Sequence, residues 1–227
     1  MPWGSVQNLV PKQQSVLSTT GLSTAFASNV TAGDVVVATS LFLTTGASTP
    51  TFSDTSSNVT SWNSTGQQIA SGASISLASA WGVATATGAC TPKVVWSGGA
   101  TAIMELFGGE FSTPGGPVTQ DGALAFVNQV ASVTSMAVTA NGTQPNGLLV
   151  VMFGCGATFG AFTGAWVAMG ASVGDDAGYL LNAAGNSTAT ATQSPAGGYG
   201  ALVIALTTTG GAAVARPAVP RRMPIGA

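Results

Sequence analysis

Any catalytic activity of this chain would depend on carboxyl groups, because the chain contains seven Asp and Glu residues and no histidine. A β-sandwich glycosidase needs two carboxyl groups about 5–9.5 Å apart across the scissile bond. Glu105 and Glu110 are the nearest candidates, but their odd separation places them on opposite faces of an uninterrupted strand. Gly108-Gly109 is expected to end the strand between them. Glycan hydrolysis is therefore the weakest hypothesis, and Glu105 is expected to be a semi-buried structural carboxylate bonded to backbone, Thr or Ser.

A second acidic candidate is the Asp175-Asp176 pair, which stands between glycines with Asn182 nearby. Calcium takes six to eight oxygen ligands, so this pair is a weak candidate for a metal site. A solvated turn is the simpler interpretation. Asp34 and Asp54 each stand beside a turn signal and are expected to accept local hydrogen bonds rather than bind a ligand. We predict no metal and no cofactor.

Other reactions lack the residues they need. The serines have no histidine base, Lys12 and Lys93 lie in no S-x-x-K pattern, and no G-x-x-x-x-G-K phosphate loop occurs. Cys90 and Cys155 are too few for a disulfide framework or a zinc site. Two buried free thiols are the simpler interpretation, and a single disulfide between the two halves is the alternative. We predict a protein that is not an enzyme.

The composition excludes several other classes. Only 5% of the 227 residues are charged, whereas 45% are hydrophobic, which is the opposite of a disordered chain. The net charge of −2 gives no basic face for nucleic acid. The uncharged segment 147–170 carries the G-x-x-x-G spacing of membrane helices, but its six glycines each cost about 1 kcal/mol in a helix. We therefore expect a strand and a Gly-rich connection there, and neither a membrane segment nor a secretory signal.

Runs of β-branched and alternating apolar residues between turn signals predict strands throughout the chain. Ile75, Leu77 and Trp81 alternate on one face of a half-buried strand. No window holds a helical stripe, and residues 122–130 are the only place for a short helix. Strands are expected at 35–43, 74–81, 93–97, 101–107, 132–139, 148–153, 166–173, 187–193 and 200–208. The sequence predicts an all-β protein.

Two halves are suggested by a Pro/Gly boundary at 113–117 and by similar elements that open at Asp34 and Asn146. The halves are either two structural repeats or two sets of strands that interleave into one sandwich. We prefer one sandwich, because each half alone has few strands with which to cover a sheet. The prediction is a single two-sheet antiparallel β-sandwich over 19–209, with extended arms at 1–18 and 210–227.

The C-terminal arm differs in charge from the body. Residues 1–209 hold two basic and seven acidic groups, a net of −5, whereas the arm holds three arginines, a net of +3. Its prolines favour a stiff, extended strip. We expect this strip to bind an acidic or polar surface of an adjacent subunit, through Arg216, Pro217, Pro220, Arg221 and Arg222.

Tryptophans offer a second kind of binding surface, because their rings can stack on sugars. Trp81 and Trp96 lie in predicted strands and are expected in the core. Trp62 lies among Ser and Asn residues and is the candidate for glycan stacking.

Three stretches and a closing strand resemble, in order, a β-sandwich module of bacteriophage structural proteins and bacterial surface proteins. That module runs G-D-L-L-V-V, V-x-D-S-x-G-N-x-W/Y and E-Y/F-S-G. The match covers residues 20–209 and departs at Ser57, where the module has Gly, and at 106–108, where it has an aromatic residue, Ser and Gly. The resemblance implies a jelly-roll-like fold and a structural or adhesive role, with no catalytic residues. The matching stretches are Gly33-Asp34-Val35-Val36-Val37, 52–62, Ile103-Met104-Glu105-Leu106-Phe107-Gly108-Gly109 and 201–206.

These observations favour a virion structural protein, a bacteriophage capsid decoration or other outer-shell component, whose partners are copies of itself and other virion proteins. It would be assembled in the host cytoplasm. A free monomer with so little charge would be poorly soluble, whereas a subunit in a lattice covers much of its surface. The alternative is a carbohydrate-binding or adhesion module of a phage fibre or bacterial surface protein.

Overall fold

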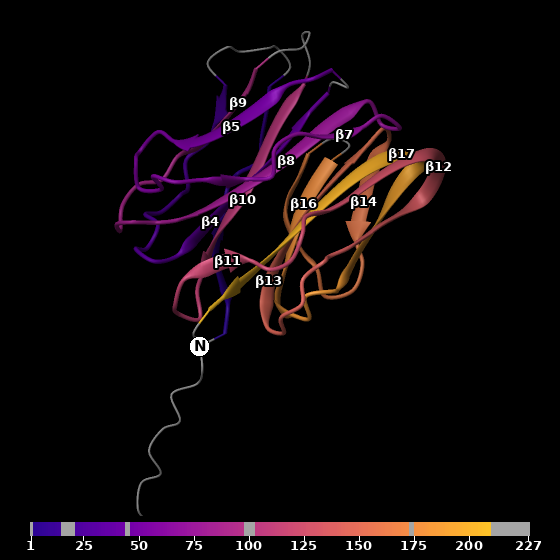
Figure 1. The fold of residues 1–227 in the computed structure, drawn as a ribbon. Coiled ribbons are helices and arrows are strands. Elements are labelled where there is room, and N and C mark those ends of the chain that lie inside the picture. Colours follow the sequence, from indigo (N-terminus) through magenta and orange to yellow (C-terminus); the bar gives the residue numbers. More distant parts are fainter. Residues whose placement is uncertain (1, 15–20, 44–45, 98–102, 173–174, 210–227) are drawn as a thin grey trace, which may run out of the picture.

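The computed structural model describes residues 2–14, 21–43, 46–97, 103–172 and 175–209. Within these ranges the chain forms strands and no helix, and every strand pair is antiparallel (Figure 1). Two large sheets pack face to face, and a small third sheet lies outside the first. The predicted all-β antiparallel sandwich is confirmed.

The first half of the chain forms one large sheet and the small sheet. The large sheet has the order β1-β10-β4-β8-β6, with β2 also on β10 and β7 also on β8. The small sheet has the order β3-β9-β5. Their strands are β1 (Gly4–Asn8), β2 (Lys12–Gln14), β3 (Leu22–Ser23), β4 (Val35–Phe42), β5 (Thr49–Asp54), β6 (Asn63–Ser64), β7 (Gln68–Ala70), β8 (Ile75–Val83), β9 (Pro92–Ser97) and β10 (Met104–Ser112).

The second half forms the other large sheet, with the order β11-β17-β13-β16-β15 and with β12 and β14 also on β17. The long strand β17 therefore has different partners along its length. The strands of this second large sheet are β11 (Val118–Gln120), β12 (Ala125–Thr139), β13 (Gly147–Cys155), β14 (Thr158–Phe162), β15 (Val167–Ser172), β16 (Asp175–Ala183) and β17 (Thr188–Thr208).

The two large sheets share one topology. In the first, β4 lies between β10 and β8; in the second, β13 lies between β17 and β16. Each of these central strands follows a turn with a left-handed residue, Gly33 with φ 91° and Asn146 with φ 60°. In the first half β1 and β2 precede the central strand and pair with the last strand, β10, and in the second half β11 and β12 pair in the same way with β17. Among the described strands, the two halves therefore do not interleave: each half forms one large sheet, and the two large sheets pack against each other as a sandwich.

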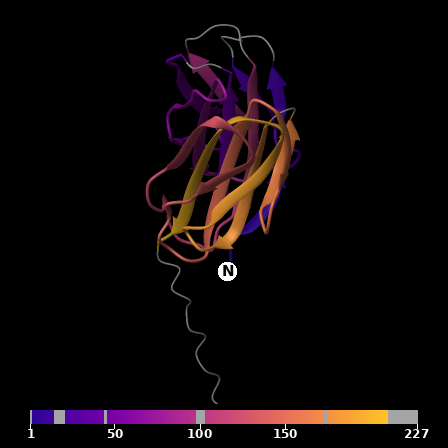
Figure 2. The ribbon, with the colours of Figure 1, turned by 90° about the vertical axis from the view of Figure 1, so that its right-hand side faces the viewer.

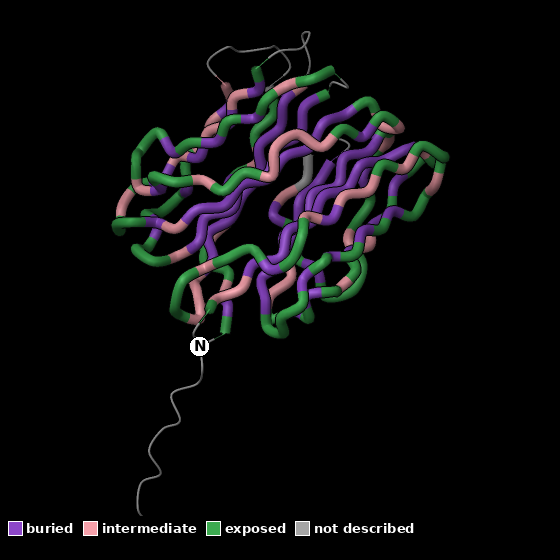
Figure 3. Tube along the Cα trace, in the orientation of Figure 1, coloured by how far each residue is buried: buried purple, intermediate pink, exposed green. Residues whose placement is uncertain are grey.

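The main core lies between the two large sheets, where Leu77 and Phe107 pack with Met152 and Leu202. The outer face of the first sheet is covered by the small sheet, and there Trp96 stacks on Phe42 with ring centroids 5.5 Å apart. The outer face of the second sheet is covered by β12, β14 and the first part of β17 (Figure 2). The central strands are consequently buried on both faces (Figure 3).

This layering corrects the prediction that β8 is half-buried, although Ile75, Leu77 and Trp81 do share the inner face as expected. Trp81 and Trp96 are both in the core, as predicted.

Several strand boundaries also differ from the predictions. Strand β10 continues through Gly108, where a Cβ atom would lie 2.5 Å from the Val37 carbonyl oxygen, so this glycine permits close packing and does not end the strand. The segments 187–193 and 200–208 form one strand, β17, and residues 125–130 of the predicted helix lie in β12. The N-terminal residues are extended, as expected, but β1 and β2 pair with β10 and belong to the first sheet. The segment 147–170 begins with β13, as predicted, but the Gly-rich connection expected after it contains a further strand, β14.

Candidate functional site

The acidic residues lie almost entirely inside the protein. Six of the seven are buried, and Asp34 is half-buried. On the described surface, charge is therefore confined to Lys12, Lys93 and the exposed part of Asp34. The basic arm residues Arg216, Arg221 and Arg222, with Pro217 and Pro220, lie outside the described residues. The described surface of the chain is therefore neutral and polar rather than acidic. The buried acids are Asp54, Glu105, Glu110, Asp121, Asp175 and Asp176.

Glu105 is bonded to Asp175 across the interface between the two large sheets. Glu105 comes from β10 and is 1% exposed, so it is fully buried rather than semi-buried; its Oε1 accepts a bond of 2.7 Å from Gln13 Nε2. Asp175 comes from β16, and its Oδ1 accepts the Cys155 N–H at 3.0 Å. The two carboxyl groups hydrogen-bond to each other. Burial, and then the charge of Glu105, raises the pKa of Asp175 to about 8, so we expect the two carboxyl groups to share a proton near neutral pH.

The two glutamates of β10 lie on opposite faces of the strand, as predicted. Glu110 faces away from the second sheet, where it bonds to the Asp34 side chain and accepts the Thr31 N–H at 2.7 Å and Gln7 Nε2 at 2.6 Å. Each glutamate is thus paired with an aspartate, not with the other glutamate. In both pairs the carboxyl groups are in direct contact, whereas a glycosidase needs a sugar linkage between them.

Asp175 and Asp176 do not form a joint metal site. They are consecutive in β16, so their side chains point to opposite faces of the strand, and both are buried rather than in a solvated turn. Burial raises the pKa of Asp176 to about 7, against the lowering effect of the Ala177 backbone N–H. Within the described ranges, no group of three or more His, Cys, Asp and Glu side chains is placed to hold a metal ion.

Asp54 closes a turn, as the sequence predicts for it. Its carboxylate accepts the backbone N–H groups of Ser56, Asn58 and Val59 at 2.9, 2.8 and 3.1 Å, and that of Thr91 at 2.7 Å. Burial acts to raise the pKa of Asp54, but the four bonds outweigh it and hold the pKa below 3.8. The turn is fixed in this way beside the predicted glycan candidate.

Trp62 lines a hollow of about 360 Å³ next to this turn. The side chain is half-buried and stacks on Phe52, with ring centroids 6.4 Å apart and planes 27° apart. Its indole N–H is buried and has no hydrogen-bond partner within the described chain. One face of the ring is therefore taken by Phe52, and the hollow beside it also includes Ser53, Asp54, Ser57, Val59 and Thr60.

A larger groove, of about 640 Å³, opens between β8 and β11. Its lining combines Trp81 of the first half with a strand of the second half. Because these residues are far apart in the sequence, the groove could not be predicted from a local motif. The run of Val, Thr and Gln at 118–120 shows no signal of its own. We call this the Trp81 groove; it is lined by Thr60, Ser61, Asn63, Trp81, Val83, Thr85, Val118, Thr119 and Gln120.

The two cysteines are free and buried, which confirms the simpler interpretation. Cys90 packs outside the first sheet and Cys155 packs outside the second. Burial raises the pKa of both thiols, that of Cys155 to about 11. Both therefore stay protonated and unreactive at neutral pH.

No helix long and apolar enough to cross a membrane occurs in the described ranges. Compared with protein-family models, with curated proteins and with solved structures, the chain finds no match.

Proposed function

We propose that this chain is a non-enzymatic structural protein of a bacteriophage particle, a capsid decoration or other outer-shell component that packs against copies of itself and other virion proteins. The observation that carries the proposal is the neutral surface. With six of seven acids buried, the described part of the chain presents hydroxyl, amide and small apolar side chains to its neighbours. Identical subunits with such a surface pack closely without repulsion between like charges.

The open edges of the sheets support the same role. Among the described strands, β15 lies at one end of the second sheet and β11 at the other, and β6 and β7 lie at one end of the first sheet. Sheet edges with unpaired backbone groups are prone to pair with other chains. In a lattice, these unpaired backbone groups would form contacts between neighbouring subunits. Exposed Val6, Val130 and Val167 add apolar area for such contacts.

Particle incorporation tests the proposal. The chain is co-expressed with the other structural proteins of its particle, and its copy number per particle is measured by mass spectrometry. One variant places Glu at Ser132 and Thr134, which are exposed on β12; a matched control places Gln at the same positions. We expect the Glu variant to lose most of its incorporation and the Gln variant to keep it. Equal incorporation of both variants would argue against a neutral packing surface.

The arm is tested separately by deleting residues 210–227. We expect the truncated chain to fold and to be incorporated less; unchanged incorporation would refute a tethering role for the arginines.

The second candidate function is adhesion to a surface glycan through Trp62, favoured by the half-exposed ring above an open hollow. Trp62→Ala should abolish adhesion to cells without changing incorporation. Loss of incorporation alone would place Trp62 in a packing contact.

A further inference from the structure

We propose that the Trp81 groove is a binding site for a neutral oligosaccharide, distinct from the Trp62 hollow. This proposal does not depend on the shell role, because it rests on a groove that the two halves build together. Trp81 and Val83 come from the end of β8, the 60–63 segment forms one wall, and β11 forms the other. The volume of about 640 Å³ lies within the range of about 300–1,000 Å³ of small-molecule sites.

The lining has the chemistry of a sugar site. None of its nine residues is charged; six carry hydroxyl or amide groups, and Trp81 supplies an aromatic ring. The hydroxyl groups of Thr60, Ser61 and Thr119 make no hydrogen bond within the described chain, so they are available to a ligand. A charged ligand would find no counter-charge in this lining. Hydroxyl groups of a neutral sugar can exchange hydrogen bonds with these side chains at no cost of charge burial.

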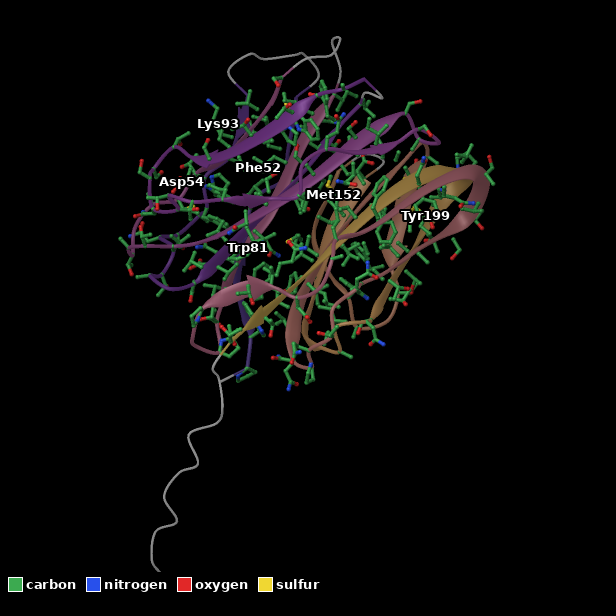
Figure 4. All side chains as sticks on the ribbon, in the orientation of Figure 1. Phe52, Asp54, Trp81, Lys93, Met152 and Tyr199 are labelled. Atoms are coloured by element: carbon green, nitrogen blue, oxygen red, sulfur yellow. The ribbon has the colours of Figure 1, made fainter. Side chains whose placement is uncertain are left out.

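Trp81 gives a second, independent indication. Its side chain is 7% exposed and its indole N–H has no hydrogen-bond partner within the described chain. Figure 4 places Trp81 on the side of the first sheet that faces the second half. A buried donor without a partner costs about 1–3 kcal/mol. A ligand hydroxyl, or a water that bridges to it, would supply the missing acceptor.

The walls of the groove are fixed before a ligand arrives. A Cβ atom at Gly82 would lie 2.4 Å from the Ser61 carbonyl oxygen and 2.4 Å from Val59 Cγ1. Gly82 therefore lets the 59–61 segment lie directly on β8, between the two residues that line the groove. On the other side, β11 is held by pairing with β17 through Val118 and Gln120. A preformed site binds without an ordering cost.

A glycan fits this groove better than a peptide does. β11 is the edge strand of its sheet among the described strands, but it spans only three residues. Strand addition draws its affinity from a row of main-chain hydrogen bonds, which so short an edge does not provide. The hydroxyl and amide side chains around the groove suit a ligand that carries hydroxyl groups on every ring.

The experiment uses the full chain and three neutral probes: cellotetraose, maltotetraose and chitotetraose. A glycan array first compares neutral with acidic glycans. Calorimetry then measures the dissociation constant of the strongest neutral probe, and the assigned indole N–H resonance of Trp81 is followed by NMR. The groove variants are Thr119→Val and Ser61→Ala, whose hydroxyls make no internal bond. The matched control is Thr51→Val, an exposed threonine of β5 outside the groove.

We expect at least one neutral probe to bind and to shift the Trp81 indole resonance. Each groove variant should weaken binding about three- to tenfold, as expected for the loss of one hydrogen bond, and the control should not change it. Three results would overturn the proposal. They are binding confined to acidic glycans or extended peptides, no binding of any neutral glycan, and binding that is lost in Trp62→Ala but unchanged in both groove variants. The last result would locate the sugar in the Trp62 hollow.

Discussion

The raised pKa of Asp175 beside Glu105 predicts that the contact between the two sheets is sensitive to pH. Burial and the neighbouring carboxyl group raise the pKa of Asp175 from 3.8 to about 8 in the folded protein. The folded state therefore binds a proton that the unfolded chain has released, at any pH between these values. Its contribution to stability is complete below pH 4 and is lost as the pH rises toward 8. The Cys155 thiol, which packs on the outer face of the second sheet, stays protonated over this pH range because its pKa is about 11.

The size of this effect follows from linkage. While the folded state holds one more proton than the unfolded chain, the free energy of unfolding falls by about 1.4 kcal/mol for each pH unit that the pH rises. Between pH 5 and pH 8 the loss amounts to about 4 kcal/mol. The perturbation that isolates it is Asp175→Asn. The asparagine oxygen can still accept the Cys155 N–H, and its amide can donate to Glu105. We expect the variant to match the wild type near pH 5 and to be more stable at pH 8.

Urea unfolding, followed by tryptophan fluorescence at pH 5, 6, 7 and 8, measures how the free energy of unfolding of the wild type and of Asp175→Asn changes with pH. Asp176, whose pKa is about 7, contributes a slope of the same sign to both proteins, so it cancels in the comparison. Asp121→Asn is the control. Although burial acts to raise the pKa of Asp121, bonds from Gln144 and Thr143 hold it below 3.8, so the cost of this variant should not change with pH. Parallel pH slopes for wild type and Asp175→Asn would refute the shared proton.

Three further predictions concern stability and reactivity. Asp54→Asn faces four backbone N–H groups with only one acceptor oxygen, and we expect it to lower the free energy of unfolding by about 2–4 kcal/mol; a loss below 1 kcal/mol in urea unfolding would contradict this. Phe107→Ala empties a fully buried site between the sheets and should cost about 3–5 kcal/mol, measured in the same way against Phe107→Leu. A thiol reagent at pH 8 should label neither Cys90 nor Cys155 until urea is added, and rapid labelling of the native protein would show that one is accessible.

The sequence predicted the central strands because their residues carry the signal locally. The β-branched run of β4 and the apolar run of β13 each follow a turn that needs a left-handed residue, and both were located to within two residues. The outer strands were harder. Strand β16 begins with Asp175-Asp176 between glycines, a composition that favours a turn. The structure instead places Asp175 between the sheets, where it hydrogen-bonds to Glu105, seventy positions earlier in the chain.

Glycine was misread for a related reason. At Gly108 the absent side chain serves the close approach of Leu9 and the Val37 carbonyl oxygen, a tertiary contact that no local pattern reveals. The Trp81 groove has the same origin, because its second wall is β11, a strand of three residues without a periodic signal. The Trp62 hollow lay within one continuous motif, so sequence reasoning could point to it.

The paired acids connect the fold to the proposed function. Strand β10 carries one glutamate on each face, and each is held by an aspartate from another part of the chain, so the two pairs join β10 to β16 and to the turn before β4. Acids that most proteins leave in water are here used as internal hydrogen-bond partners. The low charge of the sequence therefore understates how neutral the described surface is. Contacts on such a surface depend on shape, hydroxyl groups and uncharged area, which suit both the proposed lattice subunit and the proposed neutral glycan site.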